Sequence, residues 1–262
     1  MQESPFRGTL DWRRFFAAPT HEEALARLHF LVDEARPLGL LLGPAGSGKS
    51  LVLEVFARRL LRAGAQVANL NLSGLDLHEF LWLIAAELGI NPDRREDSFR
   101  IWRGILDRLT ENRYQQLSTI LLLDDVDEAA PTVLDHVARL TQINNTPRGR
   151  LSIVLSASTS ALRRLTPRLI ELAELRVDLE PWEPTDTVQY VRGALVQAGA
   201  DAPVFSDEAL ERLHDLSGGI PRRVNRLANF ALLAGAGREL NEIDVDTVEG
   251  AHLELDVASA VA

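Results

Sequence analysis

The sequence predicts an α/β protein in which a parallel sheet lies between two layers of helices, a three-layer αβα arrangement, followed by an all-helical segment. Apolar runs typical of strands alternate with helical patterns as far as Glu180, and this alternation favours a parallel sheet covered on both faces. After the proline-rich stretch "PWEPTD" only helical patterns remain. We therefore expect an α/β core with an N-terminal helical lead-in over residues 1–180, and a helical domain over residues 181–262.

The five expected strands are short runs that are apolar at nearly every position. Continuous apolar character is typical of a parallel strand that is buried on both faces. The expected strands cover residues 38–42, 66–73, 118–125, 151–158 and 175–180.

Helices are expected between these strands because apolar residues recur there at helical spacing. One of them opens with Asp76 and Glu79, whose separation fits a capping box. The expected helices of the core cover residues 21–35, 49–64, 76–89, 99–109 and a segment that starts at Pro131.

Four more helices are expected after residue 180, and most of them end at a glycine, as helices commonly do. Ser206 is expected to be an N-cap, and Pro221 the first residue of its helix. These helices cover residues 185–199, 206–219, 221–235 and 244–255.

Composition and charge disfavour several classes of protein. The 262 residues contain no cysteine, which removes disulfides, thiolate nucleophiles and cysteine-based zinc sites and fits a reducing compartment. The sequence has no long apolar run and no signal-like start, so we expect a cytoplasmic protein without a transmembrane segment. The net charge of -10 repels phosphate backbones, which disfavours nucleic acid as a partner.

The stretch "GPAGSGKS" fits the phosphate-binding pattern G-x-x-x-x-G-K-[ST] and lies between an expected strand and an expected helix. Glycines allow backbone N–H groups to turn toward a phosphate, and the helix N-terminus adds positive potential. We expect Lys49 to contact the β and γ phosphates of ATP and the Ser50 hydroxyl to ligate Mg²⁺. The expected nucleotide-binding residues are Gly43, Pro44, Ala45, Gly46, Ser47, Gly48, Lys49, Ser50 and Leu51.

The strand "TILLL" ends in "DDVDE", which places Asp124 and Asp125 at the carboxyl end of a buried strand, where open α/β sheets bind ligands. We interpret Asp124 as part of the Mg²⁺ shell. Asp125 is the candidate that orients or deprotonates the attacking water, with Glu128 as a weaker substitute. Asp127 and Glu128 are otherwise interpreted as solvated turn residues.

The stretch "SGGIPRRVN" places Arg222 and Arg223 in the first turn of an expected helix. The helix dipole disfavours a cation there by roughly 0.3–1 kcal/mol, so an anionic partner such as a γ-phosphate would explain these arginines. A pair of cations screened by solvent is the alternative.

Together these segments resemble the AAA+ ATPases, and within them the ExeA/GspA-like group found beside bacterial type II secretion and pilus systems. The resemblance rests on "THEEALARLHFLV", "LLLGPAGSGKS", "ILLLDDVDEA", "LSIVLSASTSALRRL" and "FSDEALERLHDLSGGIPRRVNRLANFALL". It implies a P-loop NTPase core of the AAA+ type, with the C-terminal helices forming a lid.

The same resemblance implies roles for individual residues. It makes Gly43 to Ser50 Walker A, Asp124 the Walker B magnesium residue and Asp125 the catalytic acid position. It makes Arg222 sensor 2 and places sensor 1 at Ser158, with Thr159, one residue later, as the alternative position. Two arginines occupy the region from which family members offer an arginine finger to a neighbouring subunit: Arg168 and Arg176. The alternative for either is an ordinary surface residue.

Three departures from the family pattern qualify these expectations. The Walker B pair is Asp-Asp where the group usually has Asp-Glu, which puts rapid hydrolysis in question. Sensor 1 is serine where the group commonly shows a glutamine-containing loop. We expect no counterpart of the membrane and peptidoglycan-binding regions of that group, so their role at the cell wall is not carried over.

The leading hypothesis is an ATP- and Mg²⁺-dependent AAA+ ATPase, a homo-oligomer in which nucleotide state moves the lid and the subunit interface to act on an unidentified protein partner. The first alternative is a slow nucleotide-held switch similar to the STAND branch, whose "LLLDD" and "GGLP" motifs resemble "LLLDD" and "GGIP" here. The second is a DNA-acting ATPase related to the transposition target regulators. A small-molecule phosphotransferase is disfavoured by the all-helical C-terminal segment.

Overall fold

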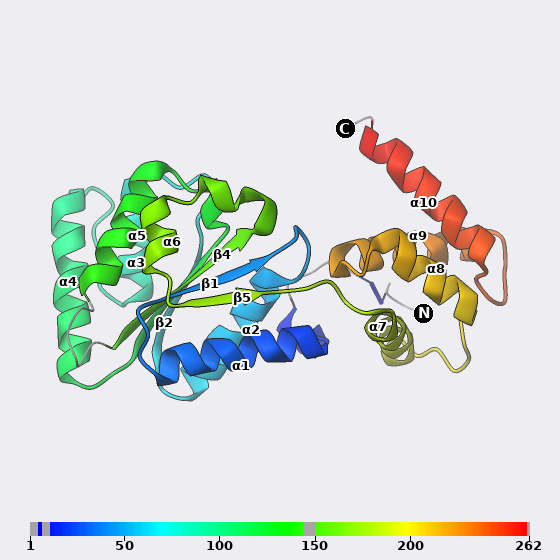
Figure 1. Cartoon of the computed structure of the whole chain (residues 1–262), viewed down its shortest axis with the longest axis horizontal. Coiled ribbons are helices and arrows are strands. Elements are labelled where there is room, and N and C mark those ends of the chain that lie inside the picture. The colour runs from blue at the N-terminus through cyan, green and yellow to red at the C-terminus, as the bar shows by residue number, and fades with distance from the viewer. Residues whose placement is uncertain (1–4, 7–10, 144–149, 261–262) are drawn as a thin grey trace. The chain divides into compact units, whose positions relative to one another are not determined.

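A computed structural model describes residues 5–6, 11–143 and 150–260, and within them it confirms the predicted fold class (Figure 1). Five parallel strands with flanking helices are followed by a segment that is helical throughout. The chain divides into two compact units. The α/β unit comprises His21–Ala45 and Lys49–Leu179, and the helical unit comprises Met1–Thr20, Gly46–Gly48 and Glu180–Ala262.

The strands form one parallel sheet in the order β2-β3-β4-β1-β5. Because β4 lies between β1 and β3, its carboxyl end adjoins the carboxyl ends of both neighbours. The register pairs Gly43 with Ser158 and Leu123 with Leu155. The strand bounds are β1 Leu38–Gly43, β2 Gln66–Asn71, β3 Thr119–Asp124, β4 Leu151–Ser158 and β5 Leu175–Asp178.

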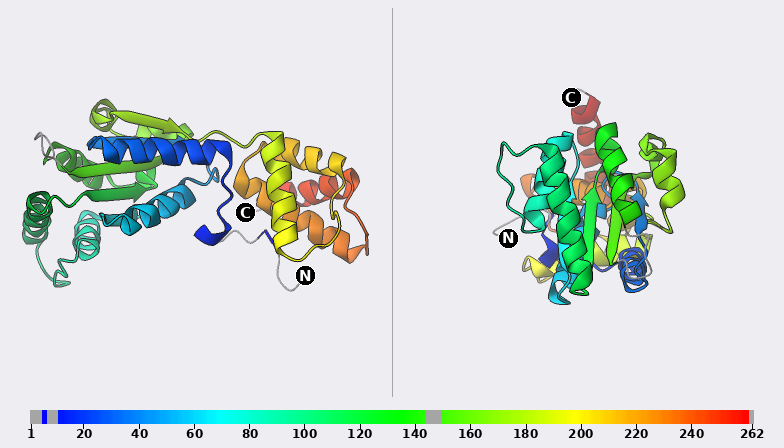
Figure 2. Two further views of the ribbon diagram at one scale, coloured as in Figure 1. Left: turned by 90° about the horizontal axis from the view of Figure 1, so that it is seen from below. Right: turned by 90° about the vertical axis from the view of Figure 1, so that its left-hand side faces the viewer.

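Helices cover both faces of the sheet. Alternate residues of β1 (Leu38, Leu40 and Leu42) join the large core cluster that also takes in residues of the helices from α3 to α6. On the opposite face Gly39 leaves room for α1, because a Cβ at that position would lie 2.3 Å from Leu31 Cδ1. The left view of Figure 2 looks onto α1 and α2 on this second face. The bounds are α1 Pro19–Asp33, α2 Lys49–Arg62, α3 Leu77–Glu87, α4 Ser98–Tyr114, α5 Pro131–Ile143 and α6 Pro167–Leu172.

Four helices and their own apolar cluster make up most of the helical unit. Phe6 joins this cluster and lies 6.3 Å, between ring centroids, from Tyr190. Tyr190 in turn contacts Trp182, with ring centroids 4.8 Å apart. The helix bounds are α7 Pro184–Gln197, α8 Asp207–Ser217, α9 Pro221–Gly237 and α10 Val245–Ala260, and the 3-10 turn η1 covers Trp12–Arg14.

Several local predictions are confirmed. Asp76 accepts from the backbone N–H of Glu79, whose carboxylate accepts from the backbone N–H of Asp76, so the capping box is complete. Ser206 caps α8, and Pro221 begins α9. The sequence did not predict α6 or the 3-10 turns η2, Val126–Glu128, and η3, Thr159–Arg164. Among the helices of the described residues, none combines the length and the apolar character that crossing a membrane requires.

Candidate active site

The P-loop connects the end of β1 to the start of α2 through a turn that depends on two glycines. Gly46 has φ 86° and Gly48 has φ 100°, values that side chains with a Cβ rarely adopt. Lys49 is the first residue of α2, so the turn ends at a helix N-terminus, where backbone N–H groups attract anions. The loop thus combines two positive-φ glycines with a helix N-terminus, the features expected of a phosphate-binding loop.

Lys49 is buried within this loop and is the only lysine in the sequence. Its Nζ donates to the carbonyl oxygens of Gly43 and Pro44, both at 3.1 Å. Ser47 is also buried, and Ser50 is half-buried in the first turn of α2. The ammonium group is therefore held against the first two residues of the loop, which are among those predicted to bind the nucleotide.

Asp124 is the last residue of β3, and the residue is only 6% exposed. The Ser156 hydroxyl, from the adjacent strand β4, donates to Asp124 Oδ1. The same hydroxyl oxygen accepts from the backbone N–H of Asp125 at 3.4 Å. Ser156 is fully buried. This one side chain therefore forms a hydrogen bond with each of the two residues of the predicted Walker B pair, Asp124 and Asp125.

Asp125 has φ 51° and ψ 44°, the left-handed conformation, which aspartate tolerates better than most residues. Its Oδ2 accepts from Asn71 Nδ2 at 2.8 Å. Asn71 ends β2, whose register pairs it with Asp124. The backbone of this residue and one carboxylate oxygen are therefore both fixed by neighbouring strands.

The two acidic residues that follow, interpreted from the sequence as solvated turn residues, lie in the 3-10 turn η2, and both carboxylates accept hydrogen bonds from other parts of the chain. Asp127 Oδ1 accepts from the backbone N–H of Ser158 at 3.3 Å. Glu128 Oε2 accepts from the Ser73 hydroxyl at 2.7 Å. These bonds attach η2 to the carboxyl ends of β4 and β2.

Ser158, the predicted sensor 1, ends β4 directly beside Gly43 in the sheet register. Its hydroxyl lies 2.9 Å from the Ser160 hydroxyl. The sheet thus places Ser158 at the same edge as the P-loop and Asp124, which is where the sequence predicted a ligand site.

The three predicted arginines lie on three different elements. Arg176, on β5, donates from Nε to Asp178 Oδ2 at 2.9 Å and from Nη2 to Asp178 Oδ1 at 2.8 Å. Both this hydrogen bonding and the charge of Asp178 raise the pKa of Arg176 further above its usual value. Arg168 is exposed in the first turn of α6 and forms no ion pair among the described residues. Arg222 is exposed in the first turn of α9.

The glycines of "SGGIP" have a structural role within the helical unit. Gly218 ends α8 in the left-handed conformation. Gly219 has φ 65°, and a Cβ there would lie 2.2 Å from the carbonyl oxygen of Trp182. The backbone N–H of Trp182 donates to the Gly219 carbonyl oxygen at 2.9 Å. These contacts fix the turn from which α9, with Arg222, begins.

Sequence reasoning missed Ser156 and Asn71. The signal for Ser156 was a serine inside the strand-like run "LSIVLSAS", which also contains Ser152 and Ser158, because a buried hydroxyl needs a hydrogen-bond partner. Asn71 carried a weaker signal, a polar residue at the end of a predicted strand.

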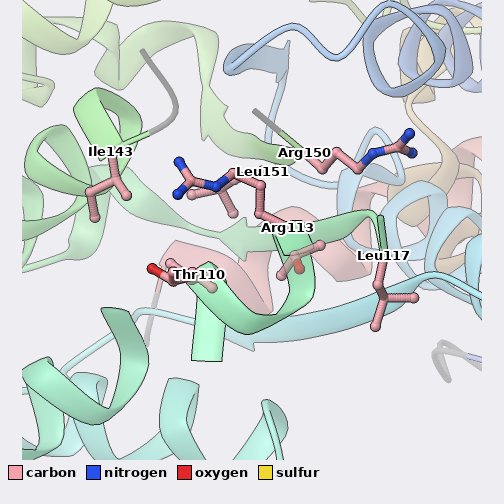
Figure 3. A pocket seen from close by; sticks show the side chains of 8 residues that line it. Thr110, Arg113, Leu117, Ile143, Arg150 and Leu151 are labelled. Carbon is pink, nitrogen blue, oxygen red and sulfur yellow. The ribbon is translucent and has the colours of Figure 1, made fainter. Parts of the chain in front are cut away.

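A hollow of about 30 Å³ lies at the opposite edge of the sheet, where the strands begin (Figure 3). Thr119 and Leu151, the first residues of β3 and β4, line it together with Thr110, Arg113 and Arg150. Ligand pockets usually hold about 300 Å³ or more, so this hollow is too small for a nucleotide.

Comparisons with known proteins identify the family of this chain. Residues 32–165, just over half of the chain, match the family model AAA_22, described as an AAA domain. General secretion pathway protein A of Aeromonas hydrophila is 29% identical over 247 residues, which are 93% of this chain and 45% of that protein. The chain thus spans less than half the length of this relative.

Solved structures share the fold. Cdc6p of Pyrobaculum aerophilum has a TM-score of 0.71 at 18% identity, covering 93% of this chain and 68% of that one. The ORC1 protein of Aeropyrum pernix, in a structure with DNA, has a TM-score of 0.69 at 20% identity, covering 92% and 67%. From the matched family model and the geometry of the P-loop, this chain belongs to the AAA domain family of AAA+ ATPases, as its resemblance to the ExeA/GspA-like group predicted.

Proposed function

We propose that this chain binds ATP with Mg²⁺, hydrolyses it, and uses the change of nucleotide state to rearrange its helical lid and the interface between subunits of a homo-oligomer. The main observation that supports the proposal is that three adjacent strands, β3, β4 and β1, end at the same edge of the sheet. There β1 leads into the P-loop, β4 contributes Ser156 and Ser158, and β3 contributes Asp124.

The residues at this edge fit the two groups. A glycine turn that ends at a helix N-terminus suits a polyphosphate. The Ser50 hydroxyl and the Asp124 carboxylate are oxygen donors, which Mg²⁺ prefers. The described residues contain no cluster of three acidic, histidine or cysteine side chains that would hold a metal alone. That agrees with Mg²⁺, which commonly uses one or two protein ligands beside phosphate oxygens.

Each residue then has a distinct task in hydrolysis. Lys49 binds and orients the β and γ phosphates, and Ser50 and Asp124 hold Mg²⁺, which neutralises charge on those phosphates when bound. Asp125 orients the attacking water and accepts its proton. Arg222, at the start of α9, contacts the γ-phosphate and so makes the position of the helical unit depend on the nucleotide. Ser158 supplies a polar contact at the sensor 1 position.

A slow switch of the STAND type is the second candidate, and the geometry of Asp125 favours it. Aspartate is one methylene shorter than glutamate, and Asn71 already engages one of its oxygens. A carboxylate held in this way is a poor base until Asn71 releases it. The chain would then hold ATP much longer than a motor does.

A function on DNA is less well supported. The Aeropyrum pernix ORC1 structure contains DNA, but its identity to this chain is only 20%, which supports a shared fold alone. The net charge of -10 opposes binding to a phosphate backbone.

Lys49→Ala should abolish ATP binding in calorimetric titrations, because the loop loses its only cationic side chain. Arg62→Ala, at the far end of α2, is the control and should bind normally. Since Lys49 is the only lysine, an amine-acylating reagent modifies one side chain, and ATP should slow that modification in the wild type. Normal ATP affinity in Lys49→Ala would contradict the assignment of the P-loop.

Ser156→Ala should raise the Mg²⁺ concentration needed for half-maximal ATP turnover and lower the turnover rate roughly tenfold. The buried Asp124 carboxylate loses a hydrogen bond worth about 1.5–3 kcal/mol. ATP binding measured in the presence of a chelator should stay unchanged. Ser152→Ala removes another buried hydroxyl from β4 and is the matched control. Equal Mg²⁺ requirements in the two variants would show that Ser156 does not position the metal ligand.

Asp125→Asn should lower steady-state turnover by roughly 10²-fold or more while ATP binding persists, because the general base is lost. Asn71→Ala should keep or raise turnover, since it releases the Asp125 carboxylate. A wild type that binds ATP tightly without turnover above background, and gains turnover in Asn71→Ala, would instead identify the slow switch.

Arg168→Ala should remove any increase in turnover per subunit with protein concentration, because an arginine finger acts across a subunit interface and contributes roughly 10³-fold. Arg176→Ala should have a much smaller effect, since Asp178 already engages that guanidinium. Mixing Arg168→Ala with Lys49→Ala should restore part of the activity. In a mixed oligomer, the Arg168 side chain of a Lys49→Ala subunit would complete the nucleotide site of a neighbouring Arg168→Ala subunit, whose P-loop is intact. Failure of this mixture to complement would exclude Arg168 as the finger.

A further inference from the structure

A groove of about 530 Å³ lies on the helical layer of the α/β unit formed by α3, α4 and α5, whose labels appear at the left of Figure 1. Leu81 of α3 and six residues of α4 line it on one side, and His136 and Arg139 of α5 on the other. None of these residues belongs to the nucleotide site, so the proposed ATPase function does not account for the groove.

Arg139 is held in a fixed position at this groove. Its guanidinium carbon lies 4.6 Å from the centroid of the Trp102 ring, and its Nη1 donates to His136 Nε2 at 3.1 Å. Because arginine can only donate, Nε2 accepts, and the proton of His136 is on Nδ1, which donates to the Thr132 carbonyl oxygen at 2.9 Å. The His136 ring also meets Trp102 edge to face, at 5.3 Å between centroids.

This guanidinium is pre-organised but lacks a carboxylate. Among the described residues no ion pair involves Arg139 or Arg103, the other arginine of the groove. A fixed arginine loses little freedom when it forms a further hydrogen bond, and its planar fork suits a carboxylate. It is therefore ready to bind an anionic group.

Apolar side chains adjoin the two arginines. Phe99, in the first turn of α4, is 71% exposed, whereas Trp102, three residues later, is 9% exposed and forms part of the wall. Leu106, half-buried, continues the same face of α4. A partner with one apolar or aromatic side chain could cover Phe99 here.

We propose that the groove binds a short acidic peptide segment of another protein, with an aromatic or aliphatic anchor flanked by Asp or Glu. Charge complementarity favours this partner: the lining carries two guanidinium groups and one carboxylate, Asp107, in a chain whose net charge is -10. Nucleic acid fits less well, because that net charge repels a phosphate backbone and Phe99 offers apolar surface.

The test is a selection of phage-displayed random dodecapeptides on the full-length wild type, with counter-selection against the double variant Phe99→Ser and Arg139→Gln. Enriched peptides should be acidic and contain an apolar anchor. Fluorescence anisotropy with the synthesised peptides should show dissociation constants that rise roughly tenfold or more in each single variant, as expected for loss of an apolar anchor or of a charge-assisted hydrogen bond.

The chain offers a matched control on α4 itself. Arg113 stacks on the exposed Tyr114, with its guanidinium carbon 5.6 Å from the ring centroid, and neither residue lines the groove. Arg113→Gln and Tyr114→Ser should leave peptide affinity unchanged. All four variants should keep the wild-type circular dichroism and basal ATP turnover, which shows that they fold.

Three results would overturn the proposal. The selection enriches no peptide that depends on the groove; the enriched peptides are basic or uncharged; or the control substitutions weaken binding as much as Phe99→Ser and Arg139→Gln. Loss of single-stranded DNA binding in the groove variants, without acidic peptide binding, would assign the surface to nucleic acid instead.

Discussion

The candidate site depends on one buried hydroxyl. Ser156 donates to the Asp124 carboxylate and accepts from the Asp125 backbone N–H, so it joins the proposed metal ligand to the proposed base. A nearly buried carboxylate is unfavourable unless hydrogen bonds compensate for its lost hydration. Ser156 supplies that compensation from β4, the strand that also pairs with the P-loop strand. The order of the strands therefore determines both the stability and the position of the acidic pair.

Much of the fold was predictable because its information is local. Apolar runs, a capping box and the glycine-lysine-serine pattern each occupy a few consecutive residues, and those predictions of the fold are confirmed. The partners of the acidic residues were not predictable in the same way. Ser156 is 32 residues from Asp124 in the chain, and Asn71 is 54 residues from Asp125. Only the strand order brings them together, and nothing in the local sequence encodes that order. Helix α6 was missed because six residues are too few to show helical periodicity.

The basic side chains divide into two chemical kinds with different tasks. Of the 28 lysines and arginines, Lys49 is the only lysine. A compact ammonium fits within the P-loop and reaches two backbone carbonyl oxygens, whereas a planar guanidinium is better suited to carboxylates and aromatic faces. Arginines indeed form the exposed ion pairs and stack on Trp102 and Tyr114. Such exposed pairs contribute little to stability, typically about 0–1 kcal/mol. The arginines of greatest interest are therefore those without an acidic partner in the described chain, such as Arg139 and Arg168.

The groove and the active site share one continuous segment of chain. Asp124 and Asp125 lead into η2, and η2 leads within a few residues to Pro131, where α5 begins and continues to His136 and Arg139. The carboxylates of η2 are bonded to Ser158 and Ser73, so the start of α5 is attached to the edge of the sheet where nucleotide is proposed to bind. A peptide in the groove can affect hydrolysis only if its affinity differs between nucleotide states. The hydrogen bonds of η2, together with the packing of α5 in the core that includes β3 and β4, are the contacts through which such a difference would arise.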